Sequence, residues 1–146
     1  MKIALASDHR GYKLKQELIE NLKQNYEIID IGTTSEESAD FPVYGIKLGE
    51  TIKENKDTIG IAICATGIGI SIAANKVKGI MCAKISNKEE ARLAKEHNRA
   101  NVIAISGNLS KKEALEMIYE FLNAKEIEEE KYIRRIEQIR KYENGN

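Results

Sequence analysis

Two side chains with transferable protons and two glycines follow one apolar run in this sequence. The run, residues 59–63, alternates isoleucine with glycine and alanine, which is typical of a strand covered on both faces. Cys64 and Thr66 come directly after it, and Gly67 and Gly69 follow. A thiol beside the beginning of a helix can act as a base, and glycine amides can bind the oxyanion that results. This stretch is therefore the first candidate for a proton-transfer site.

Each of these signals also has a structural explanation. Cys64 is equally explained as a small apolar residue that ends a buried strand, although Thr66 and the glycines favour chemistry. The pattern Gly67-Ile68-Gly69 lacks the full dinucleotide fingerprint, and no Gly-x-x-x-x-Gly-Lys-Ser/Thr sequence occurs, so nucleotide binding is a second choice. Cys82 lies inside another predicted strand and is not followed by a glycine-rich loop, so we interpret it as a core residue.

The two histidines, His9 and His97, follow a predicted strand end and a predicted helix end. Taken singly, each is explained by solvation or capping. Asp8 beside His9, however, places an acid–base group and a cation together. These residues and Cys64 contain the donor atoms of a zinc site, but no pair has the local spacing of known zinc motifs, so we predict no metal.

Five short apolar runs alternate with segments of helical periodicity, and these elements must position the candidate residues. In the helix predicted at 12–25, for example, Leu14, Leu18 and Leu22 form the apolar face, with Lys15 and Lys23 on the other face. The other helices are predicted at 41–55, 70–76, 87–97 and 110–123, and the strands at 2–7, 27–31, 59–63, 80–85 and 102–105. This alternation predicts an α/β protein, a three-layer α/β/α sandwich with a five-stranded parallel sheet.

Ligands of such sheets bind outside the carboxyl ends of the strands, where the strand order reverses. In this sequence three of those ends carry polar loops, at residues 8–10, 64–67 and 106–108. We therefore expect these loops to meet at one edge of the sheet.

The last segment, residues 126–142, is dense in charge yet carries a narrow apolar stripe of Tyr132, Ile136 and Ile139. Their spacing of i, i+4 and i+7 predicts an extra C-terminal helix that lies on another surface, such as a partner subunit. The basic residues Lys131, Arg134, Arg135 and Arg140 are explained as a solvated face, with arginine at a phosphate as the alternative.

Composition excludes several classes of protein. The 146 residues fit a single domain, residues 1–146, and 23 basic residues balance 23 acidic ones, so no net field attracts nucleic acid or an anionic membrane. Aromatic residues make up only 5% and tryptophan is absent, which disfavours a base-stacking surface. With two cysteines and no apolar run near 18 residues, we expect a cytoplasmic protein, with no membrane partner, that binds a small polar molecule.

Three motifs together resemble those of the ribose-5-phosphate isomerase B family, which also includes galactose-6-phosphate isomerase subunits and allose-6-phosphate isomerases. They are Ser7-Asp8-His9, the pattern Cys64-x-Thr66-Gly67-x-Gly69-x-Ser71-x-Ala73-Ala74-Asn75-Lys76, and Glu96-His97-Asn98-x-x-Asn101. The resemblance covers nearly the whole chain in order. It implies a Rossmann-like homodimer, in some members paired into tetramers, with an active site shared between subunits and with no metal or organic cofactor.

The resemblance also implies a role for each matching residue. Cys64 would move a proton between C1 and C2 of an open-chain sugar phosphate through an enediolate. Asp8 would handle hydroxyl protons, and His97 would assist ring opening. The enediolate would be stabilised by Thr66 and by the amides of Gly67, Ile68, Gly69, Ile70 and Ser71. The substrate-binding positions are His9 and Arg135 on the phosphate side and Asn98 on the sugar.

Several positions depart from the commoner family pattern, and most of them fall where the phosphate and sugar bind. Phe41 replaces a frequent tyrosine, Asn108 replaces a phosphate-binding arginine, and Lys131 keeps the charge of another arginine without its bidentate fork. Arg99 stands where an acidic or amide residue is common, and Arg10 where a small residue is typical. We hypothesise that Arg10, with Arg99 as a second candidate, offsets the loss of charge at Asn108.

The expected function is therefore an aldose–ketose isomerase that interconverts ribose 5-phosphate and ribulose 5-phosphate. A hexose 6-phosphate, such as allose or galactose 6-phosphate, is the nearest alternative substrate. Two alternatives lie outside this class of enzyme. One is a non-catalytic sugar-phosphate or nucleotide sensor, which has no need of a thiol beside an oxyanion loop, and the other is a cysteine-dependent hydrolase.

Overall fold

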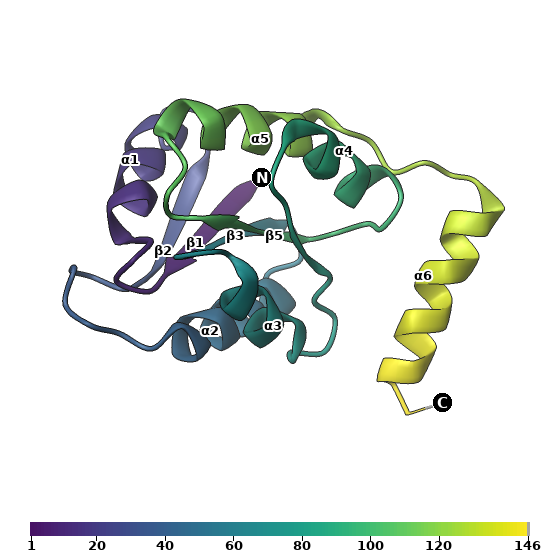
Figure 1. Ribbon diagram of the computed structural model, residues 1–146. Helices are drawn as coiled ribbons and strands as arrows, with labels where there is room; N and C mark the ends of the chain where they lie inside the picture. The colour runs from purple at the N-terminus through teal and green to yellow at the C-terminus, as the bar shows by residue number, and fades with distance from the viewer. Residues whose placement is uncertain (146) are drawn as a thin grey trace.

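Five parallel strands form the central sheet of the protein, for which a computed structural model describes residues 1–145 (Figure 1). In sheet order the strands are β2 (Glu27–Gly32), β1 (Lys2–Ser7), β3 (Thr58–Cys64), β5 (Val102–Ser106) and β4 (Cys82–Lys84). β3 is central and buried along its whole length, as its unbroken apolar run predicts. The predicted five-stranded parallel sheet is confirmed.

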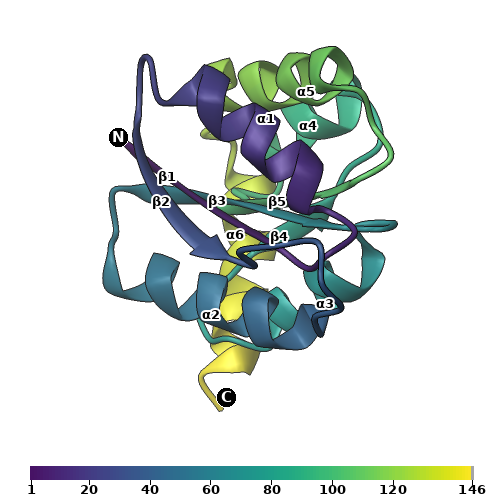
Figure 2. The same cartoon turned by 90° about the vertical axis from the view of Figure 1, so that its left-hand side faces the viewer.

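Helices cover both faces of this sheet and complete the predicted three-layer sandwich (Figure 2). On one face lie α1 (Tyr12–Leu22), α4 (Lys88–Glu96) and α5 (Lys111–Asn123), which enclose the larger core with the isoleucines of β1, β3 and β5. On the other face lie α2 (Phe41–Glu54) and α3 (Ile68–Asn75), over a core of smaller residues. A capping box begins α5, in which the side chains of Ser110 and Glu113 each accept a hydrogen bond from the other's backbone amide.

The strand order reverses between β1 and β3, because β2 lies on one side of β1 and β3 and the later strands lie on the other. A cleft for ligands is expected at such a switch point, outside the carboxyl ends of the strands. The loops that follow β1 and β3 contain Asp8 and Cys64, so both residues flank the switch point.

The edge strand β4 is shorter than the predicted run of residues 80–85. Two asparagine side chains bind the backbone of the segment before it. Asn101 accepts from the amide of Met81 at 2.8 Å and donates to the carbonyl of Gly79 at 2.9 Å. Asn75 forms two bonds with the backbone of Cys82, at 2.7 and 2.8 Å. Side chains therefore satisfy backbone groups that a longer strand would pair in the sheet.

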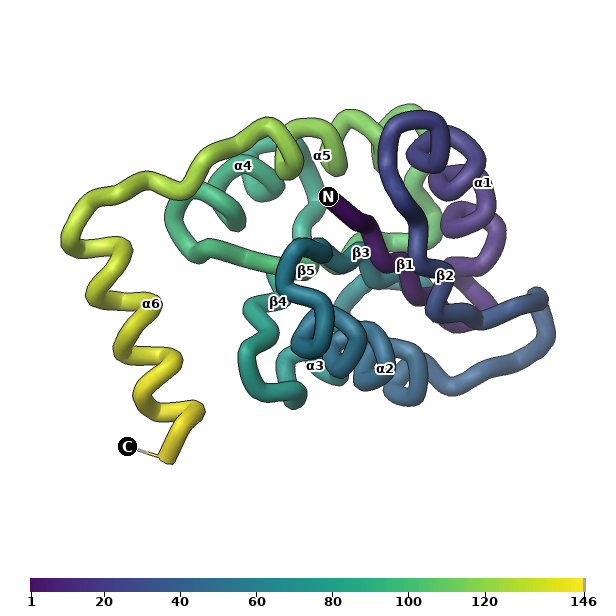
Figure 3. The backbone as a smooth tube through the Cα atoms, turned by 180° about the vertical axis from the view of Figure 1, so that it is seen from behind, coloured from purple at the N-terminus to yellow at the C-terminus, as the bar shows by residue number. Residues whose placement is uncertain are grey.

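The C-terminal helix α6 begins at Glu130 and ends at Glu143, whereas the sequence predicts a start near Glu126. The preceding residues, 124–129, form an extended segment that runs from α5 past the end of α4 (Figure 3). The amide of Ile127 donates to the carbonyl of Glu96 at 3.0 Å, and this tertiary contact replaces a bond within a helix. None of the helices within residues 1–145 is long and apolar enough to cross a membrane.

Candidate active site

Cys64 ends β3 with its thiol 5% exposed, and the chain then turns tightly into α3. The amide of Gly67 donates to Cys64 Sγ at 3.2 Å, which stabilises negative charge on sulfur. Gly67 has φ +84°, and a Cβ there would lie 2.9 Å from the carbonyl carbon of Ile105. Only glycine fits this turn, which brings the beginning of α3 next to the thiol.

The beginning of α3 supplies backbone amides to the same place. Three of the five amides predicted to hold the oxyanion already bind within the chain: Gly67 to the thiol, Ile68 to Thr66 Oγ1 at 3.1 Å, and Ser71 to the carbonyl of Gly67 at 3.3 Å. The amides of Gly69 and Ile70 occupy first-turn positions that have no acceptor within a helix. They remain the best-placed donors for an anion, and Thr66 is exposed with its own hydroxyl proton available.

Asp8 lies in the neighbouring loop, 6% exposed, after the end of β1. Its Oδ1 accepts from the amides of Arg10 at 2.9 Å and Gly11 at 3.2 Å, so one carboxylate oxygen is fixed by the backbone. The amide of Asp8 donates to the carbonyl of Ile63, one residue before Cys64. The predicted acid–base residue and the predicted base thus lie on adjacent strand ends.

The third predicted loop, residues 106–108, packs against both of the others. The amide of Gly107 donates to the carbonyl of Cys64 at 2.8 Å, and Ser106 Oγ donates to the carbonyl of Ala65 at 2.7 Å. A Cβ on Gly107 would lie 2.5 Å from the carbonyl oxygen of Arg10. Ser106 has no predicted role, although its position at a strand end beside a turn glycine is a signal that the sequence contains. The prediction that the three loops meet is confirmed.

A fourth segment, the loop of residues 33–40, closes one side of this edge. Nδ1 of His9 lies 3.1 Å from the amide nitrogen and 3.2 Å from the carbonyl oxygen of Ala39. Phe41, the first residue of α2, packs its ring so closely on Gly69 that a Cβ there would lie 2.8 Å from ring carbons. The phenylalanine that replaces the family's tyrosine therefore contacts the oxyanion loop through its ring.

His97 and Asn98 lie at the opposite edge of the sheet. Cys64 pairs with Ser106 at the carboxyl end of β5, whereas His97 and Asn98 precede Val102 at its amino end. At about 3.3 Å per residue, β5 alone separates the two edges by about 13 Å. His97 stacks on Tyr132 of α6, with ring centroids 4.4 Å apart and planes 9° apart. One chain therefore does not bring His97 and Asn98 to Cys64.

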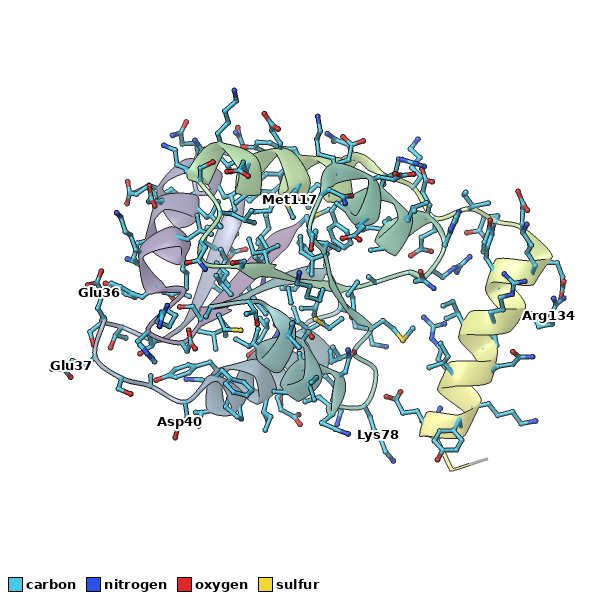
Figure 4. The ribbon with its side chains drawn as sticks, viewed as in Figure 1. Glu36, Glu37, Asp40, Lys78, Met117 and Arg134 are labelled. Atoms are coloured by element: carbon cyan, nitrogen blue, oxygen red, sulfur yellow. The ribbon has the colours of Figure 1, made fainter. Side chains whose placement is uncertain are left out.

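The two candidate cations of α6 are also remote from Cys64. The helix lies beyond the β4 side of the sheet, across the body from the 33–40 loop (Figure 1), and Figure 4 shows Arg134 on it and Glu36 and Glu37 on that loop. Arg135 is exposed, and Lys131 lies 3.9 Å from Glu129 and 5.0 Å from the ring centroid of Tyr132. Both belong to the same end of the molecule as His97.

The proposed substitutes for the missing phosphate arginine differ in their surroundings. Arg10 is exposed and lies in the loop beside Cys64. Arg99, 18% exposed, is instead held by Glu126 at 3.3 Å and Glu128 at 3.1 Å. Because two carboxylates already hold its guanidinium, the structure favours Arg10 over Arg99 as the substitute for the missing phosphate contact. Asn108 directs its amide to the carbonyl of Ala65 at 3.5 Å.

A groove of about 410 Å³ lies away from Cys64. It separates α6 from β4, and Asn98, Met81, Cys82 and Ile139 line it. Burial raises the pKa of the Cys82 thiol from 9.0 to about 12, which keeps it protonated and unreactive. In residues 1–145 no three histidine, cysteine, aspartate or glutamate side chains gather closely enough to hold a metal ion.

Comparison with known proteins agrees with this geometry. The sequence model of a family described as Ribose/Galactose Isomerase matches residues 3–139. The chain is 38% identical over 144 residues to the probable ribose-5-phosphate isomerase B of Mycoplasma pneumoniae, covering 97% of this chain and 94% of that one. It is 37% identical over 139 residues to the ribose-5-phosphate isomerase B of Escherichia coli, covering 94% and 93%.

Solved structures resemble the whole chain as well. The ribose-5-phosphate isomerase B of Clostridium thermocellum superposes with a TM-score of 0.92 at 43% identity, covering 99% of this chain and 98% of that one. The enzyme of Mycoplasma genitalium, solved with bound ribulose 5-phosphate, gives a TM-score of 0.92 at 35% identity, covering 99% and 97%.

The fold and the site together define a Rossmann-like α/β protein with a buried thiol beside the beginning of a helix, at the switch point of a parallel sheet. The chain belongs to the ribose/galactose isomerase family, and its curated relatives are ribose-5-phosphate isomerases B. The resemblance seen in the sequence motifs is confirmed.

Proposed function

We propose that this protein interconverts ribose 5-phosphate and ribulose 5-phosphate, with Cys64 as the base. The observation that carries the proposal is the thiol at the end of β3, which accepts the Gly67 amide and adjoins the first turn of α3. A relative with this fold was solved with ribulose 5-phosphate bound, and this supports a pentose phosphate as the substrate.

The reaction needs two proton transfers and no external reductant. Cys64 as thiolate takes the proton from C2 of the open-chain aldose, and the carbonyl oxygen at C1 becomes the enediolate oxygen. The free amides of Gly69 and Ile70, with the Thr66 hydroxyl, stabilise that charge. Asp8 transfers the hydroxyl proton from O2 to O1, and the Cys64 thiol returns its proton to C1, which yields the ketose. Each group ends in its starting state.

We propose that the working unit is a homodimer whose two sites are each built from both copies. Ile68 and Ile72 project from α3 with exposed fractions of 55% and 56%, directly beside the Cys64 loop. The groove between α6 and β4 is apolar and includes Asn98. Seating α3 of one copy in that groove of the other covers both apolar surfaces. It also carries His97 and Asn98 of the partner toward Cys64 and explains the apolar stripe of α6. Dimers paired into tetramers would need a further surface.

The phosphate of the substrate is assigned to His9 and Arg10 of one copy and to Arg135, with Lys131, of the other. Arg10 and Arg135 are exposed, and neither forms an ion pair with another residue of the described chain. Lys131 contributes a point charge, because its ammonium lacks the fork of an arginine. The neutral Asn108 leaves this end of the site with fewer fixed cations than the common family pattern.

A substrate panel tests this proposal against the hexose alternative. Ribose 5-phosphate, allose 6-phosphate and galactose 6-phosphate are compared by kcat/KM with the wild-type protein. We expect ribose 5-phosphate to be preferred at least about tenfold, since an added carbon changes the distance that the substrate must span between Cys64 and the cations that bind its phosphate. A preference for a hexose 6-phosphate would overturn the assignment of the substrate, and conversion of no sugar phosphate would overturn the enzyme proposal itself.

We further propose a cytoplasmic location. Both cysteines are free thiols in the structure, and the candidate base requires Cys64 to stay reduced. Fractionation of cells that express the native protein tests this proposal, with recovery in the cytosolic fraction as the expected result.

A further inference from the structure

One buried charge lies outside the site described above. Lys15 of α1 is 0% exposed, although the sequence predicts it on the polar face of that helix. Its Nζ lies 2.7 Å from Asp30 Oδ1 and 2.9 Å from Gln16 Oε1, and 5.3 Å from the ring centroid of Tyr12. A fully buried lysine is rare unless it is paired, so the ion pair with Asp30 accounts for the burial of this side chain.

The pair holds the place where the chain leaves β2. Asp30 Oδ1, which accepts from Lys15, also accepts from the amide of Gly32 at 3.0 Å. Gly32 has φ +111°, a conformation that favours glycine, and the next amide, of Thr33, donates to the carbonyl of Ser7 at 2.7 Å. Lys15 therefore fixes the carboxylate that shapes the first turn of the 33–40 loop.

That loop leads directly to the site. Most of its residues are exposed, among them Glu36, Glu37 and Asp40, which Figure 4 places along its outer side. Because few of its residues contact the core, the conformation of this loop depends on the contacts at its two ends. Its far end contacts His9 through Ala39, and Phe41 follows against Gly69.

We propose that Lys15 is a positioning residue, which through Asp30 fixes the 33–40 loop and so orients His9 toward the substrate. Nδ1 of His9 contacts Ala39 near the far end of this loop, 3.1 Å from its amide nitrogen and 3.2 Å from its carbonyl oxygen, so the loop fixes the orientation of the ring and of its other nitrogen, Nε2. The inference rests on the proposed isomerase function for its kinetic consequence, but the orientation of His9 can be measured without activity.

The kinetic test is Lys15→Met, which keeps the length of the side chain and removes the charge. We expect KM for ribose 5-phosphate to rise about tenfold with kcat within about twofold, because His9 acts on binding and takes no part in the proton transfer at carbon. In a His9→Ala background the same substitution should leave KM unchanged. Lys23→Met is the matched control, because Lys23 follows the same helix and pairs only with Glu20 at the surface.

The spectroscopic test uses the two histidines of the chain. In wild-type protein the ¹⁵N shifts of His9 should report one predominant tautomer, fixed by the contact of Nδ1 with Ala39, whereas Lys15→Met should move them toward a mixture of tautomers. The signals of His97 account for the second histidine, and Lys23→Met, in which the His9 shifts should stay unchanged, serves as the reference. Asp30→Asn, whose parent side chain is 43% exposed, provides the same comparison if Lys15→Met does not fold.

Each outcome decides one question. Unchanged His9 shifts in a folded Lys15 or Asp30 variant would overturn the positioning role, whatever the activity. A KM that rises equally with and without His9 would also overturn it, since the effect would not pass through that ring. Wild-type protein without isomerase activity would overturn the proposed function alone, because the shifts of His9 would still test its orientation.

Discussion

At the scale of single residues, the two cysteines differ because of the groups around each sulfur. Cys64 ends a central strand, accepts a hydrogen bond from the amide of Gly67 and adjoins the beginning of α3, so its sulfur faces backbone N–H groups. Cys82 lies on the short edge strand β4 beside an apolar groove, where burial raises the pKa of its thiol to about 12. The same side chain is therefore suited to catalysis at one position and inert at the other.

The raised pKa of Cys82 predicts how stability changes with pH. Below pH 9.0 the thiol is neutral in both the folded and unfolded chain, and above it only the unfolded chain ionises until about pH 12. The wild type should therefore lose stability relative to Cys82→Ala as the pH rises through this window. Urea unfolding at pH 8 and pH 10.5 should show a relative loss of at most about 2 kcal/mol, from about 1.4 kcal/mol per unit. A difference between the two proteins that is constant over this range would contradict the prediction.

At the scale of elements, the end of α4 controls where α6 lies. Arg99 has φ +51° and binds Glu126 and Glu128 of the extended segment, while Glu96 accepts the amide of Ile127. His97 between them stacks on Tyr132 of α6. These contacts connect the orientation of His97, the histidine predicted to assist ring opening, to the helix that carries Arg135.

Arg99→Asn tests this structural role, because asparagine tolerates a positive φ but forms no ion pair. We expect the free energy of unfolding to fall by about 1 kcal/mol, since the pairs are partly exposed. The dissociation constant of the dimer should rise about fivefold, the equivalent of that energy. Analytical ultracentrifugation measures the second effect, with Arg134→Asn as a control for lost charge on α6.

The alternative hypothesis, that Arg99 binds the phosphate of the substrate, predicts a different result for Arg99→Asn. If Arg99 bound the phosphate, KM would rise at enzyme concentrations that keep the dimer intact, and the dissociation constant would not change.

The elements themselves were largely predictable, and the failures have physical causes. The alternation of apolar runs and helical patterns gave five strands and their helices, because each pattern reflects local burial. Residues 126–129 fit a helical pattern, yet Arg99 and the carbonyl of Glu96 hold them extended. The helical pattern of residues 12–25 places Lys15 on the polar face, yet the ion pair with Asp30 allows the side chain of Lys15 to be buried. In each case a residue distant in sequence decides the structure, and no local pattern contains that information.

At the scale of the whole molecule, the candidate site is divided between two edges of one sheet. Asp8, His9 and the Cys64 loop meet at the carboxyl edge, as the strand ends predicted. His97 and Asn98 end a helix that leads into β5, so their place at the amino edge was readable from the order of elements. The sequence could not show how the two edges meet, because in the proposed homodimer their contact depends on a second copy.

Mixing two inactive variants tests whether the site is shared. Cys64→Ala and His97→Ala each remove one side of the site, and a mixed dimer contains one site with both residues intact. With random exchange at equal concentrations, half of the dimers are mixed, and activity should recover to about one quarter of the wild-type value. A mixture that stays inactive after exchange of subunits would contradict a shared site.

The central claim is that Cys64 transfers the proton between C1 and C2. The most direct measurement incubates the protein with ribose 5-phosphate in D₂O and follows deuterium at C2 of the recovered aldose by NMR. The account predicts incorporation by the wild type and a loss of at least about 10³-fold with Cys64→Ala, because no other base lies at that position. Exchange by Cys64→Ala at the wild-type rate would show that another group is the base and would contradict the account.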